Sequence, residues 1–118
     1  MIVKTRDNML MPYVQRIWMS PEQIAEAVQR AERALAPDVV RIRQVYKDDW
    51  AGDPSIYFKV VLSDDAASKE DQLGKTAWHV SSTIRNEIGV DQEELGLHFY
   101  FNFRSLSEVN EMNEPAWA

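Results

Sequence analysis

The chain has no cysteine, only four glycines and two histidines, and no long apolar run. The lack of cysteine excludes disulfides and thiolate metal sites, and the dispersed glycines exclude a glycine-rich phosphate loop. A membrane-spanning helix needs roughly 20 apolar residues, whereas Gln15 and Arg16 interrupt the fairly apolar segment 9–19. We therefore expect a cytoplasmic protein without a membrane segment, a disulfide or a cofactor.

The composition suits a single small domain. The 118 residues are 45% hydrophobic and 27% charged, which are ordinary values for a globular protein. The net charge is −6, and this sign disfavours unspecific attraction to nucleic acids or to membrane surfaces. A local basic patch is compatible with that balance, and the strand pattern predicts one.

The first predicted helix begins after Ser20. Ser20 can cap the free amides, Pro21 suits the first helical position, and Gln23 can complete a capping box. One apolar stripe follows, made of Ile24, Val28, Ala31 and Leu35. Pro37 ends this helix because proline disfavours a helical residue before it.

A second helix is predicted over residues 66–88. Its apolar stripe consists of Leu73, Ala77, Val80, Ile84 and Ile88. Gly89 provides a stop signal, because glycine readily adopts the left-handed conformation that ends many helices.

Three segments alternate at period two and predict strands, at 39–46, 56–62 and 97–104. The turn-rich segment 48–55 joins the first two and predicts an antiparallel hairpin. The residues expected to face the core in the first strand are Val40, Ile42 and Tyr46, and those in the last are Leu97, Phe99, Phe101 and Phe103.

The predicted order is therefore α-β-β-α-β, an α+β two-layer sandwich with both helices on one face of the sheet. Residues 19–105 form this domain, residues 1–18 an N-terminal extension, and residues 106–118 an acidic C-terminal tail. A further strand at 13–18 would make the arrangement ferredoxin-like.

The opposite sheet face is the main candidate for function. Its predicted residues mix positive charge with aromatic rings: Arg41, Arg43, Tyr57, Lys59, His98, Tyr100, Asn102 and Arg104. Such a face can bind an anionic partner protein or a second copy of the chain. It can also bind RNA by aromatic stacking, or it can be an ordinary solvated face whose basic stems cover apolar sheet.

The tail carries three glutamates and Trp117. It can fold back over its own basic face with Trp117 as an anchor, cover a partner chain, or remain frayed as many termini do. An exposed tryptophan is unfavourable, and this favours the first two alternatives.

Trp50 lies in the turn between the first two strands, beside aspartates at positions 48, 49 and 53. The turn can be held by its own side chains, with Gly52 permitting positive φ and Pro54 fixing the start of the next strand. Alternatively, it is a recognition loop that presents Trp50 to a partner.

Two sequence motifs carry a family resemblance. The W-x-G-x-P motif of residues 50–54 and the Y-F-N-F-R-S motif of residues 100–105 resemble those of small uncharacterised bacterial proteins. These proteins are often paired with a HEPN-domain protein, as in a toxin–antitoxin or defence module. The resemblance runs from Ser20 to the end of the chain. It implies a neutralising binding partner rather than an enzyme, and it assigns no role to any residue.

No pattern predicts catalysis. The adjacent carboxylates of the chain fall at predicted turns or helix starts, where they suit solvent and the helix dipole. Neither His79 nor His98 has a second histidine at metal-binding helical spacing.

The sequence therefore predicts a non-catalytic protein-binding module that also self-associates. The binding residues would be those of the open face together with Trp50 and Trp117. A small RNA-binding domain is the alternative, and a metal or ligand sensor is the third interpretation.

Overall fold

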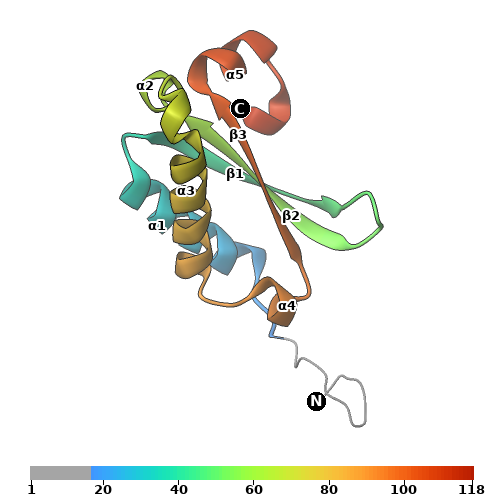
Figure 1. Cartoon of the computed structure of the whole chain (residues 1–118). Coiled ribbons are helices and arrows are strands. Elements are labelled where there is room, and N and C mark those ends of the chain that lie inside the picture. Colours follow the sequence, from blue (N-terminus) through green and yellow to red (C-terminus); the bar gives the residue numbers. More distant parts are fainter. Residues whose placement is uncertain (1–16) are drawn as a thin grey trace.

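The computed structural model describes residues 17–118, in which a three-stranded sheet carries helices on one face and a C-terminal helical segment on the other (Figure 1). Strands β1 (Val39–Asp48) and β2 (Pro54–Leu62) are antiparallel, and β3 (His98–Ser105) runs parallel to β2. The strand order is β1-β2-β3. The α+β two-layer fold predicted from the sequence is confirmed.

Helix α1 (Pro21–Leu35) begins with the predicted capping box. The Gln23 amide donates to Ser20 Oγ at 3.1 Å, and the Ser20 amide donates to Gln23 Oε1 at 2.8 Å. The buried side of α1 carries the predicted apolar stripe and Ala27 as well. Because these side chains repeat at helical spacing, burying them fixes α1 against the sheet.

The core lies between the sheet and the two long helices, α1 and α3 (Leu73–Ile88). The central strand β2 contributes Ile56, Phe58 and Val60, each fully buried. Helix α3 contributes Val80, Ile84 and Ile88, and it ends at Gly89 with a φ of 75°. The helices thus use one face of the sheet and leave the other for different contacts.

The second predicted helix, 66–88, was wrong in its first part. Helix α2 (Asp64–Ala67) and the 3₁₀ turn η1 (Glu70–Gln72) precede α3 as separate elements. The Ser68 hydroxyl donates to the Asp65 carbonyl and so competes with the helical backbone bond. The chain leaves helical geometry at the next residue, Lys69, whose ψ is 75°. Leu73 then lies at the first position of α3 and is 38% exposed rather than buried.

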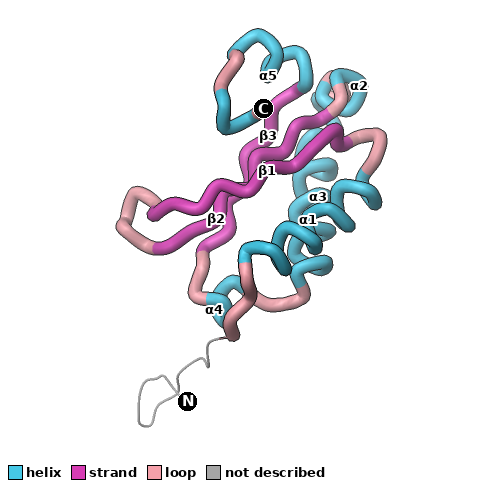
Figure 2. Tube along the Cα trace, turned by 180° about the vertical axis from the view of Figure 1, so that it is seen from behind, coloured by secondary structure: helices cyan, strands magenta, loops and turns pink. Residues whose placement is uncertain are grey.

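The predicted core position of Val40 was also wrong. The β1–β2 register shifts between Val39 and Arg41, so Val40 occupies a bulge and is 40% exposed. Val39 takes the buried place instead. Tyr46, near the end of β1, is likewise exposed, because the hairpin extends beyond the helices at this end (Figures 1 and 2).

Side chains accept hydrogen bonds from backbone amides of both outer strands, β1 and β3. Glu32 of α1 accepts the Ile42 amide of β1 at 2.7 Å. Gln92, in the short helix α4 (Gln92–Leu95), accepts the Phe99 amide of β3 at 2.8 Å. Such side-chain caps reduce the number of edge amides that could pair with another strand.

The C-terminal residues, predicted as an acidic tail, form helix α5 (Leu106–Met112) and the 3₁₀ turn η2 (Pro115–Trp117). Residues 106–118 are called the C-terminal unit below. Ser105 and Glu108 form a second capping box, and Asn113 ends α5 with a φ of 53°. The local sequence therefore determines where α5 begins in the same way as it does for α1.

The strand predicted at 13–18 lies mostly outside the described residues, since the structure describes the chain from Ile17 onward. Ile17 and Trp18 are irregular, although the Ile17 amide donates to the Glu94 carbonyl at 2.7 Å. None of the helices in residues 17–118 combines the length and the apolar character that crossing a bilayer requires.

Candidate functional site

The strand register brings the predicted open-face residues together. Because Ile56, Phe58 and Val60 point into the core, Tyr57 and Lys59 point to the opposite face. Tyr57 pairs with Tyr100, and Lys59 pairs with Arg43 on one side and Asn102 on the other. The same alternation places on this face the remaining predicted residues Arg41, His98 and Arg104.

The C-terminal unit covers one end of this face, which we call the basic half: Arg41, Arg43, Lys59 and Arg104. Arg41 donates from Nε and Nη2 to the Trp117 carbonyl at 3.1 and 2.9 Å. Arg43 Nε donates to the Ala118 carbonyl at 2.7 Å. Of the three alternatives for the tail, the structure has the one in which it folds back over its own sheet.

A small second core holds this cover in place. Val61 of β2, Val109 of α5 and Trp117 of η2 are all buried, and only 3% of Trp117 is exposed. Leu106 and Met112 pack against them. The tail therefore contributes apolar packing as well as hydrogen bonds, which is more than charge attraction alone would provide.

Trp117 also contacts two of the cations. The Lys59 ammonium and the Arg104 guanidinium carbon are each 5.3 Å from its ring. Both distances fall within the range of cation–π attraction, about 6 Å. The indole thus offers an attractive contact to the partly buried Lys59 and to Arg104, which is itself exposed.

The other end of the face, which we call the tyrosine half, remains uncovered within the described chain. It consists of Val45, Lys47, Tyr57, His98 and Tyr100. The Tyr57 and Tyr100 rings stack at 4.9 Å, and the Lys47 ammonium lies 4.6 Å from the Tyr57 ring. One face of Tyr57 therefore contacts an aromatic neighbour while a cation also approaches its ring.

The turn between β1 and β2 is built around the Asp49 carboxylate. Asp49 Oδ1 accepts the amides of Ala51 and Asp53 at 3.0 and 2.9 Å. Its Oδ2 accepts the Tyr100 hydroxyl at 2.7 Å. Gly52, with a φ of 86°, supplies the left-handed turn. The carboxylate thus fixes both the turn and its attachment to β3.

These hydrogen bonds shift the acidity of both partners. The Asp53 amide, the Tyr100 hydroxyl and the Ala51 amide lower the pKa of Asp49. The bond to Asp49, with smaller effects of burial and nearby charge, raises the pKa of Tyr100 to about 12. The turn therefore prefers an ionised aspartate and a neutral tyrosine.

Trp50 projects from this anchored turn and is 92% exposed. The structure combines the two predicted interpretations of the turn, because its own side chains hold it while Trp50 faces solvent. Trp117, the other tryptophan named in the sequence, lies at the opposite end of the open face and is buried.

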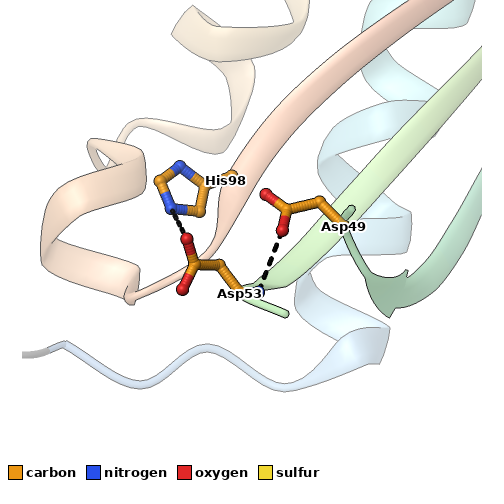
Figure 3. A group of neighbouring side chains, drawn as sticks. All are labelled: Asp49, Asp53 and His98. Atoms are coloured by element: carbon orange, nitrogen blue, oxygen red, sulfur yellow. Dashed lines mark hydrogen bonds and ion pairs between the residues drawn. The ribbon is translucent and has the colours of Figure 1, made fainter. Parts of the chain in front are cut away.

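Asp49, Asp53 and His98 meet beside the turn (Figure 3). One potential ligand atom from each lies within 4.8 Å of the others, and His98 Nε2 is 3.6 Å from Asp53 Oδ2. Imidazole and carboxylate ligands suit a divalent transition ion. Asp49 already accepts three hydrogen bonds. The trio therefore suits a polar contact that joins the turn to β3 better than it suits a dedicated metal site.

A pocket of about 500 Å³ opens where the C-terminal unit meets β3. Lys59, Asn102 and Arg104 supply its polar lining, together with Glu114 and Trp117. The Lys59 ammonium donates to Asn102 Oδ1 at 2.9 Å. Burial, followed by repulsion from Lys47 and Arg104, lowers the pKa of Lys59, and Glu114 opposes this shift.

His79 lies away from the open face. It lines a separate pocket of about 300 Å³ between α1 and α3, together with Asp38 and Lys75. The paired carboxylates predicted as structural include Asp64, which accepts the Ser107 amide at 3.0 Å and the Ser107 hydroxyl at 2.6 Å. This contact ties α2 to α5.

Sequence reasoning missed Lys47 as a member of the face and Glu114 as a member of the pocket lining. Lys47 continues the alternation of Arg41, Arg43 and Val45, and a longer predicted strand would have included it. Glu114 reaches the pocket only because α5 and η2 turn back over the sheet, and no periodicity in the tail predicts that reversal.

Comparison of the chain with protein-family models, with curated proteins and with solved structures finds no match in any of the three.

Proposed function

We propose that this protein is a non-catalytic protein-binding module whose contact surface is the tyrosine half of the sheet together with Trp50. The C-terminal unit already occupies much of the basic half through Arg41 and Arg43. A partner would therefore meet the part of the face that remains open, at the tip of the β1–β2 hairpin.

The observation that carries this proposal is the exposure of Trp50 on a fixed turn. Its side chain is 92% exposed, while Asp49 ties the turn to its own backbone and to Tyr100. Tryptophan, tyrosine and arginine dominate the binding energy of protein interfaces. A rigid support lowers the entropy lost when such a residue is buried by a partner.

The arrangement favours a protein over single-stranded RNA. RNA-binding sheets use open aromatic faces on which bases stack. Here Tyr57 and Tyr100 stack on each other, and Lys47 lies near the Tyr57 ring. The net charge of −6 adds unfavourable long-range electrostatics for a polyanion.

The family resemblance supports a particular first candidate for the partner. A HEPN-domain, toxin-like protein paired with this chain would be neutralised by binding at the tyrosine half. Self-association through the same face is the competing protein–protein proposal. Mass measurements at several protein concentrations distinguish the two, because only self-association depends on the concentration of this chain alone.

Photocrosslinking tests the proposal directly. Trp50→p-benzoylphenylalanine places a crosslinker at the hairpin tip, and Trp78→p-benzoylphenylalanine places one on α3, where the native side chain is 71% exposed. In the cells that produce the protein, we expect a discrete protein adduct from position 50 and none from position 78. Equal adducts from both positions, or adducts to RNA only, would contradict a protein-binding hairpin tip.

Metal sensing is a second candidate function because one potential ligand atom each of Asp49, Asp53 and His98 lies within 4.8 Å of the others, although Asp49 already accepts three hydrogen bonds. If this were the function, Zn²⁺ or Mn²⁺ would raise the melting temperature of the intact chain, and His98→Ala would abolish the shift. An unchanged melting temperature in the presence of either ion removes this candidate.

A further inference from the structure

The pocket between β3 and the C-terminal unit concentrates positive charge that the fold only partly neutralises. Lys59 and Arg104 line it from adjacent strands, and Glu114 is the one carboxylate of the lining. Arg104 contacts Met112 and the Trp117 ring, neither of which carries a negative charge, and Glu108, whose pKa the charge of Arg104 helps to lower, lies outside the pocket lining. An anionic group in this pocket would therefore meet two cations and a single competing carboxylate.

The polar lining is suited to a carboxylate. Asn102 uses its Oδ1 to accept from Lys59, which directs the amide nitrogen elsewhere as a hydrogen-bond donor. A lysine ammonium, a guanidinium and an amide together offer several donors to two carboxylate oxygens. The volume, about 500 Å³, suits one or two side chains rather than a duplex or a folded domain.

The backbone beside the pocket is an outer strand edge. Within residues 17–118, β3 has a neighbouring strand on one side only. Gln92 accepts the Phe99 amide on the other side, so the amides of Phe101 and Phe103 point the same way, because alternate residues of a strand share that direction. These two residues also line the pocket.

We propose that the C-terminal half of β3 binds an extended acidic segment of the partner protein, with one of its carboxylates in the pocket between Lys59 and Arg104. The segment would add to the sheet edge at Phe101 and Phe103 while its acidic side chain enters the pocket. This inference rests on the proposed protein-binding function, extends the contact surface from the tyrosine half to the pocket of the basic half, and gives the partner its chemistry.

Charge complementarity selects this occupant. The remainder of the chain is acidic overall and repels an acidic segment except at this patch, which fixes the position of binding. Glu114 lines the same pocket, so a carboxylate of the chain itself already lies near the two cations. The incoming carboxylate would compete with Glu114.

A labelled peptide tests the site on the intact protein. The probe is a fluorescent peptide of about six residues, the usual length of a strand, with alternating glutamate and valine. Fluorescence anisotropy should show binding that weakens with salt, and no binding of the matched lysine–valine peptide. Lys59→Met and Arg104→Met should each weaken binding roughly tenfold, as expected for the loss of a charge-assisted hydrogen bond.

Matched variants separate the site from general charge effects. Lys69→Met and Lys75→Met remove the same charge outside this pocket and should leave the affinity of the acidic peptide unchanged. Glu114→Gln should tighten binding because it removes the competing carboxylate. A peptide methylated on alternate amide nitrogens should bind poorly, because it cannot pair with the strand edge.

Several results would overturn the inference. These are equal weakening by all four lysine and arginine variants, full binding of the methylated peptide, or stronger binding of a single-stranded oligonucleotide than of the acidic peptide. Concentration-dependent dimers that the acidic peptide fails to dissociate would show that a second copy occupies the edge. If position 50 still crosslinks a protein while the acidic peptide fails to bind, this inference is wrong but the protein-binding function stands.

Discussion

At the scale of single residues, two tryptophans have opposite surroundings on the same sheet face. Trp117 is 3% exposed and contacts the cations of the basic half, whereas Trp50 is 92% exposed at the hairpin tip. The sequence identified both as candidates, because a tryptophan outside the core pattern needs an explanation. The sequence could not predict which of the two side chains is buried, because this depends on where the C-terminal unit packs.

Trp117→Ala should destabilise the protein by about 3–5 kcal/mol, the usual loss when a buried large aromatic side chain is truncated. The substitution empties the second core against Val61 and Val109. Urea denaturation measures the change. Trp78→Ala is the matched control, because 71% of that side chain is exposed, and it should change stability by less than about 0.5 kcal/mol. Similar losses in both variants would contradict the assignment of Trp117.

Tyr100→Phe should destabilise the protein in a pH-dependent way. In the folded protein the pKa of Asp49 is lowered, so its contribution is present above the ordinary value of 3.8 and is lost at lower pH. The pKa of Tyr100 is raised to about 12, so its contribution is present below the ordinary value of 10.0 and is lost as pH rises toward 12.

The stability difference between wild type and Tyr100→Phe should therefore be largest between these limits and shrink at both extremes. Denaturation curves across the pH range measure it, with Tyr57→Phe as the control for loss of a neighbouring hydroxyl. A difference that stays constant from acid to alkaline pH would show that the bond between Asp49 and Tyr100 does not form in solution.

At the scale of elements, local sequence signals predicted the helix ends and strands that short segments determine by themselves. The Ser20 cap, Gly89 and the period-two strands are properties of short segments, and α1, the end of α3 and all three strands appear where these signals lie. The bulge at Val40 and the break before Leu73 depend on competing backbone contacts. The cover over the basic half depends on packing between segments far apart in sequence, which periodicity cannot report.

Ser105→Ala should loosen the C-terminal unit selectively. The Ser105 hydroxyl accepts the Glu108 amide at 3.1 Å and caps α5, and loss of such a cap costs about 1 kcal/mol. Hydrogen exchange should accelerate most in the amides of α5 and η2. Ser20→Ala removes the equivalent cap of α1 and should leave exchange in the C-terminal unit less affected. Uniform acceleration in both variants would mean that the unit does not open separately.

At the scale of the whole molecule, one sheet face is divided into a covered half and an open half. Helices α1 and α3 use the other face for the core, which frees this face for the cover at one end and for the tyrosine half at the other. Arg41 and Arg43 of the basic half donate to carbonyls of the C-terminal unit, while Arg43 and Arg104 remain exposed. What remains accessible is the aromatic hairpin tip and the pocket beside β3.

The most direct test of this division is the fluorescence of variants that retain a single tryptophan. One variant keeps Trp117 and carries Trp18→Phe, Trp50→Phe and Trp78→Phe, and a second keeps only Trp50. We predict short-wavelength emission that acrylamide quenches weakly for Trp117, and long-wavelength emission that acrylamide quenches strongly for Trp50. Equal emission and equal quenching would contradict the account, because the basic half would then be uncovered in solution.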